Sequence, residues 1–370
     1  MTERVPYDRP GALLSAAPFS SGGPEEPAAF ASPSPSEAGL AGSIVRVRIP
    51  LPFPLRWVNS YLFPDSPEAG ADGGWSLVDP GLRTPEAIAV WERVLAELDL
   101  KPAKLSRIVL THHHPDHYGL AGWFQQRSGG APVLLSPEGR RQVERLWGPG
   151  TPLAGETLRL FEQHGLGSAR LADMRTHLES FLLQVNPQPE LTELRAGECV
   201  RMGSADWLAI HTPGHAYGHL CLYQPEERLM LAGDHVLPRI TPNIGFIPGE
   251  DGDPLGSYLS SLAEIARYPV RLALPGHRDP FPDLPGRAAE IARHHGERLA
   301  KMAAALAVPL SAAELCEAYF GKELTVHSLR FALSETIAHL IRLEALGLAE
   351  REERDGLIRY RACRVGESRK

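Results

Sequence analysis

Residues 111–119 read Thr-His-His-His-Pro-Asp-His-Tyr-Gly. Within this stretch His112, His114, Asp116 and His117 offer imidazole and carboxylate groups, the donor types that bind zinc and similar ions in proteins. Taken alone, the stretch also fits a histidine-rich surface loop that binds metal adventitiously. The surrounding sequence therefore has to show whether the four side chains belong to a built site.

The local sequence places this motif between a strand and a helix. Residues 106–111 form a β-branched, apolar run, and residues 120–127 have helical spacing. Pro115 fits only at the start of a helix and keeps the preceding residue extended. We therefore expect His112 and His114 to lie outside any helix. A turn of this kind can direct its first two donors to one metal ion and its last two to a second ion.

Composition limits the class of protein. A chain of 370 residues is long enough for one large domain and a small one, and its net charge of -7 argues against binding polyanions by bulk charge. Its 4 cysteines have no CxxC spacing, so we expect a reducing, cytoplasmic compartment. No apolar run approaches the roughly 18 residues of a membrane span, and the first residues lack the pattern of a signal peptide. We therefore expect no membrane partner.

Pattern and composition divide the chain into parts. Residues 1–42 are rich in Ala, Pro, Ser and Gly without apolar periodicity, which predicts a flexible tail. Residues 43–286 predict a strand-rich domain, in which 137–185 forms a three-helix insertion that either shapes substrate access or adds packing. A helix over 85–98 has Thr84 as its cap. Strands are predicted over 44–49, 57–63, 75–79, 106–111, 132–135, 198–202, 207–211, 219–223, 228–232 and 270–274.

Three further candidate ligands stand where predicted strands end. His215 lies in a Pro-Gly turn, Asp234 follows strand 228–232, and His277 follows strand 270–274. A lone histidine is more often a satisfied buried side chain than a ligand. The ends of neighbouring strands nevertheless meet at one edge of a layered fold, so these residues can join the motif.

With these residues in place, the sequence resembles the metallo-β-lactamase superfamily over roughly residues 44–285. The resemblance implies an α+β fold, a four-layer αββα sandwich of two mixed sheets with helices outside. It also implies two divalent metal ions. The residues that carry it, in the family's order, are Asp79, His112, His114, Asp116, His117, His215, Asp234 and His277.

The resemblance gives these residues roles. His112, His114 and His215 would hold the first ion, Asp116, His117 and His277 the second, and Asp234 would bridge both. Asp79 would orient the metal-binding loop, and Asp116 would also accept a proton from the bound water. Around them, Tyr118 is expected to pack under the helix rather than contact substrate, His219 and His235 to support the site, and His113 to face solvent.

Two ions about 3.5–4 Å apart lower the pKa of a bridging water toward neutrality. Zinc is expected first, and manganese or iron suit the same donors. True β-lactamases of the best-known class have cysteine where this chain has Asp234, so a β-lactam is disfavoured. We expect a dinuclear metal-dependent hydrolase that acts on a small ester, thioester or lactone.

Residues 287–370 predict a small C-terminal domain. Helices are predicted over 289–306, 311–319 and 326–346, followed by a hairpin that turns at Asp355-Gly356. Three helices and a hairpin resemble a winged helix, which the endoribonuclease-like branch of the family carries. This opens two alternatives, an endoribonuclease that cuts single-stranded RNA and a non-catalytic regulator.

The charge of this segment bears on those alternatives. It carries 14 Lys and Arg against 12 Asp and Glu, and the expected recognition helix has only Arg330 and Arg342 as bases. Phosphate binding needs a clustered basic face. Packing against the catalytic domain or dimerisation is therefore favoured over contact with nucleic acid.

Overall fold

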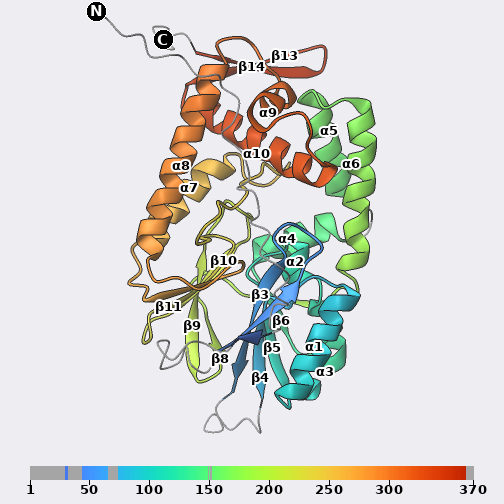
Figure 1. Cartoon of the computed structure of the whole chain (residues 1–370), viewed down its shortest axis with the longest axis vertical. Helices are drawn as coiled ribbons and strands as arrows, with labels where there is room; N and C mark the ends of the chain where they lie inside the picture. Colours follow the sequence, from blue (N-terminus) through green and yellow to red (C-terminus); the bar gives the residue numbers. More distant parts are fainter. Residues whose placement is uncertain (1–29, 32–43, 66–73, 149, 151, 364–370) are drawn as a thin grey trace, which may run out of the picture.

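The computed structural model describes residues 30–31, 44–65, 74–148, 150 and 152–363. Two sheets face each other in the lower half of Figure 1, which confirms the predicted α+β fold. In spatial order, the first sheet consists of β1 (Phe30–Ala31), β2 (Val45–Pro50), β3 (Trp57–Pro64), β4 (Trp75–Val78), β5 (Leu105–Val109), β6 (Val133–Leu135) and β7 (Leu191–Glu193). The second consists of β12 (Leu272–Pro275), β11 (Leu229–Gly233), β10 (Leu220–Gln224), β9 (Ala205–His211) and β8 (Cys199–Met202).

The space between the sheets is filled by apolar side chains from both of them. Phe63 of β3 meets Trp207 of β9 edge to face, with ring centroids 5.4 Å apart, and both side chains are buried. Val109 at the end of β5 belongs to the same cluster. Burial on the inner face fixes the register of these strands, because a one-residue slip would turn the apolar side chains outward.

The helices on the first sheet follow the predicted pattern. Thr84 accepts a hydrogen bond from the Ala87 backbone at 3.1 Å and so caps α1 (Pro85–Glu97), as expected. Trp91 of α1 and Phe124 of α3 (Ala121–Ser128) pack edge to face over this sheet. The short 3-10 helix η4 (Pro102–Lys104) leads into β5, and α2 (Pro115–Tyr118) carries half of the motif.

The outer face of the second sheet supports a larger layer. It holds α7 (Pro254–Ile265), which the sequence pattern did not predict, and α8 (Leu284–Ala305). The insertion forms the three predicted helices α4 (Pro137–Leu146), α5 (Pro152–Gln163) and α6 (Ser168–Ser180), followed by the 3-10 helix η5 (Phe181–Gln184). The C-terminal segment adds α9 (Ala312–Phe320), α10 (Val326–Ala345) and the hairpin of β13 (Ala349–Arg354) and β14 (Leu357–Ala362).

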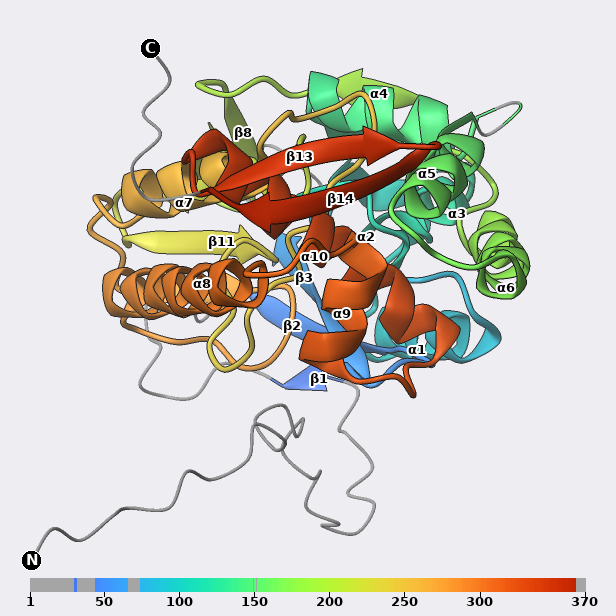
Figure 2. The ribbon, with the colours of Figure 1, turned by 90° about the horizontal axis from the view of Figure 1, so that it is seen from above.

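One apolar cluster joins the insertion, the second sheet and the C-terminal helices. Phe161 of α5, Met230 of β11 and Leu333 of α10 all belong to it. Helix α10 lies between α8 on one side and α5 and α6 on the other in both ribbon views (Figures 1 and 2). The C-terminal segment therefore packs against the rest of the chain, while a domain boundary at residue 286 stays a prediction.

The predicted flexible tail, residues 1–42, lies outside the described residues apart from β1, which pairs antiparallel with β2. Within the described part of the chain, no helix is both long and apolar enough to cross a membrane.

Candidate metal centre

The candidate ligands meet where strands of the two sheets end. The motif follows β5, His215 follows β9, Asp234 follows β11 and His277 follows β12. Their donor atoms form three groups, each with all atoms within 4.8 Å of one another: His112, His114 and His215; His112, His117 and Asp234; and Asp116, His117 and His277. All seven residues expected to bind metal are thus brought together, and the first and third groups match the two expected ligand sets.

Asp234 lies at the middle of the cluster. Its Oδ2 atom is 3.2 Å from His277 Nε2 and 3.7 Å from His215 Nε2, while Oδ1 is 3.5 Å from His117 Nε2. Asp116 Oδ2 lies 3.3 Å from His277 Nε2. Asp234 therefore reaches histidines of both ligand sets, which is the placement that a bridging carboxylate needs.

Asp79 holds the motif from beneath. Its Oδ1 accepts a hydrogen bond from the Thr111 backbone at 2.8 Å, and its Oδ2 accepts from Thr111 Oγ1 at 2.7 Å. The same Oδ2 lies 2.8 Å from His117 Nδ1. A carboxylate on Nδ1 fixes the ring and leaves Nε2 with its lone pair directed into the site. Asp79 therefore orients His117, as the resemblance implied.

Main-chain and hydroxyl groups orient the other rings in the same way. His277 Nδ1 lies 2.8 Å from the Trp57 carbonyl oxygen, and His215 Nδ1 lies 2.9 Å from the Asn243 carbonyl oxygen. Thr111 Oγ1 is 3.0 Å from His112 Nδ1. When each Nδ1–H group donates a hydrogen bond, Nε2 keeps the lone pair that can bind a metal ion.

Charge in the site is uneven. Burial lowers the pKa of His112, His114 and His215, which keeps them neutral and able to bind metal. Burial also disfavours charge on His277, yet the neighbouring Asp234 and Asp116 carboxylates raise its pKa to about 10. The buried Asp234 and Asp116 carboxylates thus favour a positive charge beside them. A bound metal ion would supply that charge in place of the proton on His277.

The donor atoms themselves test whether a metal fits. Among the described residues, four buried atoms of the candidate ligands make no hydrogen bond: Nε2 of His117, His215 and His277, and Oδ1 of Asp234. Leaving a buried polar atom without a partner costs about 1–3 kcal/mol. All four atoms face the same small region, so divalent ions bound there would satisfy them together.

Two glycines allow the strand ends to approach this closely. A Cβ atom on Gly276 would lie 2.3 Å from Asp234 Oδ1 and 2.7 Å from His117 Cε1. A Cβ on Gly233, whose φ is +48°, would lie 2.5 Å from His219 Nε2. A side chain at Gly276 would displace Asp234 or His117, and one at Gly233 would displace His219.

The three residues expected around the metal ligands, His219, His235 and Tyr118, differ in what they contact. His219 Nδ1 is 2.8 Å from Thr212 Oγ1, and its Nε2 accepts a hydrogen bond from the Asp234 backbone at 3.2 Å, so it positions Asp234. His235 is buried against the His219 and Tyr258 rings. Tyr118 is buried in the core of the first sheet and donates to Gln188 Oε1 at 2.6 Å, which is the packing role expected of it.

The prediction that His113 faces solvent is wrong. Its exposed fraction is 3%, and its ring lies 4.8 Å from that of His114. Gln142 of α4 lies beside the side chain of His113. The helical insertion therefore closes over this position, which alternation within the motif cannot reveal.

Sequence reasoning missed three groups that orient ligands. The Thr111 hydroxyl begins the motif itself, so its position next to His112 was an available signal. The carbonyl groups of Trp57 and Asn243 carry no such signal, because any residue supplies a carbonyl. Only the folded chain brings them to His277 and His215.

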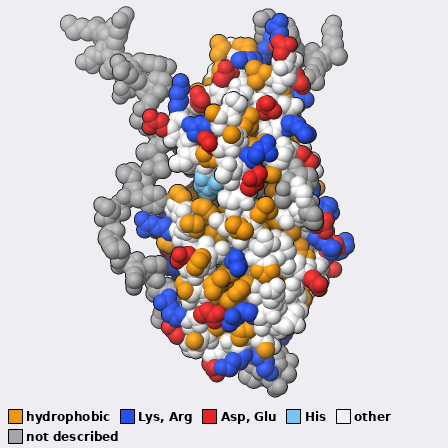
Figure 3. Space-filling model, turned by 90° about the vertical axis from the view of Figure 1, so that its right-hand side faces the viewer, with side chains coloured by type: hydrophobic (Ala, Val, Ile, Leu, Met, Phe, Trp, Pro, Cys, Tyr) orange, Lys and Arg blue, Asp and Glu red, His pale blue; other side chains and the backbone are white. Residues whose placement is uncertain are grey.

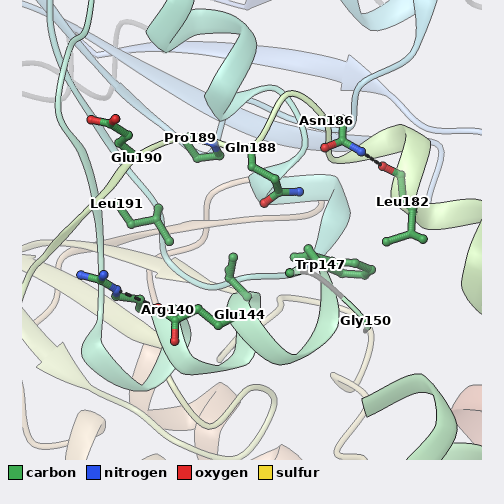
Figure 4. A pocket seen from close by; sticks show the side chains of 12 residues that line it. Arg140, Glu144, Trp147, Gly150, Leu182, Asn186, Gln188, Pro189, Glu190 and Leu191 are labelled. Carbon is green, nitrogen blue, oxygen red and sulfur yellow. Dashed lines mark hydrogen bonds and ion pairs between the residues drawn. The ribbon is translucent and has the colours of Figure 1, made fainter. Parts of the chain in front are cut away.

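A cavity of about 840 Å³ lies elsewhere, between α4 and the segment that follows η5. Figure 4 shows Trp147 on one side of it and Asn186, which donates to the Leu182 carbonyl oxygen, on the other. None of the seven candidate ligands lines it. This cavity is therefore separate from the candidate metal centre.

Comparison with known proteins agrees with this site. The profile of the metallo-beta-lactamase superfamily matches residues 58–277, and that of the metallo-beta-lactamase-like C-terminal domain matches residues 299–363. A metallo-beta-lactamase family protein from Thermus thermophilus is similar in structure, with a TM-score of 0.76 and 35% identity over 87% of this chain and 99% of that one.

Two curated relatives bear on activity. A probable metallo-hydrolase of Bacillus subtilis is 26% identical over 82% of this chain and 92% of its own length. An atrochrysone carboxyl ACP thioesterase of Aspergillus chevalieri is 26% identical over 70% of this chain; like the other fungal relatives, it is matched over less than two thirds of its length, here 64%. With the family profile spanning more than half of its residues, this chain belongs to the metallo-β-lactamase superfamily and is a hydrolase of that superfamily.

Proposed function

We propose that the chain is a dinuclear metal-dependent hydrolase that cleaves a small ester, thioester or lactone. The observation that carries the proposal is the convergence of four unsatisfied buried donor atoms around Asp234. The similarity to a thioesterase supports an acyl substrate, and a thioester is our first expectation within this class. Zinc is the favoured metal, with manganese and iron as alternatives.

Each residue then has a defined task. His112, His114 and His215 would hold one ion, Asp116, His117 and His277 the other, and Asp234 both. Two divalent ions bound there would supply a hydroxide at neutral pH and polarise the scissile carbonyl. Asp116 and Asp234 are the two carboxylates beside His277 Nε2, and Asp116 would take the proton from the attacking water. Asp79 and the Trp57 and Asn243 carbonyls keep the rings in place.

A cytoplasmic location accompanies this proposal. The four cysteines are free, and two of them, Cys221 and Cys316, are buried. Proteins without disulfides are typical of reducing compartments. A cytoplasmic enzyme would also meet small-molecule thioesters as substrates.

An endoribonuclease acting on single-stranded RNA is the second candidate, because three helices and a hairpin follow α7 in the C-terminal segment. The charges of α10 speak against it. Arg342 is paired with Asp253 at 2.8 Å, and Arg330 packs against the Phe181 ring. Neither is left on a clustered basic face of the kind that binds phosphate backbones. The winged-helix interpretation, the non-catalytic regulator and a homodimer remain alternatives to be tested.

A turnover panel on the purified, metal-analysed protein tests the proposal. We expect hydrolysis of thioesters or lactones, loss of activity with EDTA, and recovery on adding zinc, with two ions bound per chain. EDTA-sensitive cleavage of RNA with thioesters and lactones untouched would replace this proposal by the ribonuclease. A folded protein that binds two metal ions but turns over none of these substrates would favour the non-catalytic regulator.

A further inference from the structure

The first turns of α10 carry a cation and aromatic rings toward the candidate metal centre. The His327 ring stacks on Phe53, with centroids 4.8 Å apart and planes 13° apart, and Phe53 lies in the loop that leads into β3. The Arg330 guanidinium lies 5.2 Å from the Phe181 ring and 4.2 Å from the Phe331 ring. The 3-10 helix η5 and α10 thus each place an aromatic ring against this arginine.

Arg330 differs from Arg298 of α8 and Arg342 of α10, two other arginines with buried or partly buried side chains. Arg298 pairs with Glu335, and Arg342 pairs with Asp253. Arg330 forms no ion pair with a carboxylate among the described residues, and its buried Nε makes no hydrogen bond there. Stacking on aromatic rings orients a guanidinium but does not use its N–H donors.

The charge of Arg330 lies close to the metal centre. Burial lowers the pKa of Arg330 to about 10, and the nearby Asp116 carboxylate opposes that shift. The side chain is therefore still cationic at neutral pH. Burial lowers the pKa of His327 to about 4, and the Asp116 carboxylate opposes this shift as well. Arg330 is thus a cation that acts on the candidate ligand Asp116, and its buried Nε–H donor has no hydrogen-bond partner among the described residues.

The surface gives a further view of this level of the molecule. Figure 3 shows a histidine side chain reaching the surface about midway along the long axis, beside hydrophobic side chains. Helix α10 lies at this level, between the sheets below and the hairpin above (Figure 1).

We propose that Arg330 binds an oxyanion of the substrate, so that the enzyme prefers acyl groups with a carboxylate or phosphate a few bonds from the scissile carbonyl. This inference rests on the proposed hydrolase function. The planar guanidinium matches such anions with two parallel hydrogen bonds, and Phe181 and Phe331 hold it in plane. Phe181 belongs to η5, and the η5 carbonyl of Gln184 lies against Gly119 at the end of α2, so an anion bound by Arg330 would lie near the helix that carries Asp116.

The test compares thioesters that differ only at the far end of the acyl chain. These are the monothioester of glutaric acid, its neutral glutaramic analogue, and a chain ending in a phosphonate. We expect the zinc-loaded protein to favour at least one anionic substrate over the neutral one by about 10- to 100-fold in kcat/KM. Arg330→Gln should remove this preference, because it should lower kcat/KM for the anionic thioester far more than for the neutral one. Arg330→Lys should retain part of it.

Arg293→Gln is the matched control, because Arg293 is an exposed arginine of α8 paired with Glu297, and its loss should leave the preference intact. Equal rates on anionic and neutral thioesters, or an equal loss on both in Arg330→Gln, would overturn the inference. The carboxylate and phosphonate chains show which anion is preferred.

A binding measurement separates this inference from the proposed function. Benzenesulfonate and its neutral analogue methyl phenyl sulfone are titrated into the zinc-loaded protein by calorimetry. Tighter binding of the anion, lost in Arg330→Gln and kept in Arg293→Gln, supports the anion site even if no thioester is cleaved. If thioesters are cleaved but neither kinetics nor calorimetry distinguishes Arg330→Gln from the unaltered protein, the anion site is wrong and the hydrolase stands.

Discussion

Two buried clusters among the described residues combine histidine with carboxylate, and they differ in what balances the negative charge. The strand-end cluster holds the seven candidate ligands, with donor atoms of each group within 4.8 Å. The helix cluster, His295 of α8 with Glu335 and His339 of α10, meets the same distance criterion. By residue type and spacing alone, both are candidate metal sites.

Their hydrogen bonds separate them. In the helix cluster Arg298 pairs with Glu335 Oε1, and Asn243 Nδ2 donates to Oε2 at 3.2 Å. His295 Nδ1 lies 3.2 Å from His339 Nε2, so the two rings hydrogen-bond to each other. In the strand-end cluster Asp234 and Asp116 have no arginine or lysine partner within ion-pair distance among the described residues.

A resident cation therefore distinguishes a structural cluster from a metal centre. Arg298 already neutralises Glu335, and His339 hydrogen-bonds through both ring nitrogens, so a divalent ion would gain little there although His295 Nε2 has no partner. The strand-end cluster has carboxylates and free Nε2 atoms but no side-chain cation other than histidine. The following variants test this difference, starting with the largest expected effect.

Asp116→Asn is expected to lower kcat by about a thousandfold with little change in the fold, because the amide neither accepts the proton nor carries the charge that a second ion needs. His339→Gln, in the helix cluster, should leave kcat within about threefold and still bind two metal ions. Steady-state kinetics and elemental analysis check both variants. Full activity in Asp116→Asn would contradict the two-ion mechanism.

Arg298→Met is expected to destabilise the protein by about 3 kcal/mol, because it leaves Glu335 buried without its cation. Replacing both residues, as Arg298→Met with Glu335→Leu, should recover most of that loss. Urea unfolding of the metal-loaded protein measures both changes. If the single and double replacements were equally destabilising, the ion pair would not be what balances this cluster.

The strand-end cluster was more accessible to sequence reasoning than the helix cluster. Four of its ligands fall within the motif, and the others follow strands whose apolar runs are plain in the sequence. The two residues that α10 supplies to the helix cluster are one helical turn apart and meet α8 only through packing. Arg330 was recognised only as a base on an expected recognition helix, because its neighbour Phe181 comes from a distant segment.

Boundaries and short elements were the other limit. Helix α7 was missed because glycine and serine interrupt its apolar pattern, although Asp253 caps it by accepting from the Gly256 backbone at 2.9 Å. Strand β7 has three residues, too few to show alternation. Both elements depend on tertiary packing, which a single sequence does not display.

Asp79→Asn is expected to weaken binding of the second ion by about 10- to 100-fold, because His117 loses the carboxylate that orients its ring and raises its basicity. The first ion should be affected less, since two of its three histidines, His112 and His215, contact Thr111 Oγ1 and the Asn243 carbonyl oxygen rather than Asp79. Competition with a fluorescent zinc chelator measures the two affinities separately. Unchanged affinity for both ions would show that Asp79 serves only the fold.

His339→Gln should give the smallest effect, a change in how stability depends on pH. Burial lowers the pKa of His339 to about 3, whereas the unfolded chain takes up the proton near pH 6.5. Stability from this residue is therefore complete above pH 6.5 and is lost as the pH falls toward 3.

Between pH 7.5 and 5.5, the unaltered protein should lose roughly 1 kcal/mol more of its free energy of unfolding than the His339→Gln variant loses. The difference in stability between the two proteins should narrow by that amount. Urea unfolding at both pH values measures this, and metal release from the strand-end cluster cancels because both proteins share it. A difference that stays constant with pH would mean that His339 can be protonated in the folded state, and that the helix cluster is less closed than its hydrogen bonds indicate.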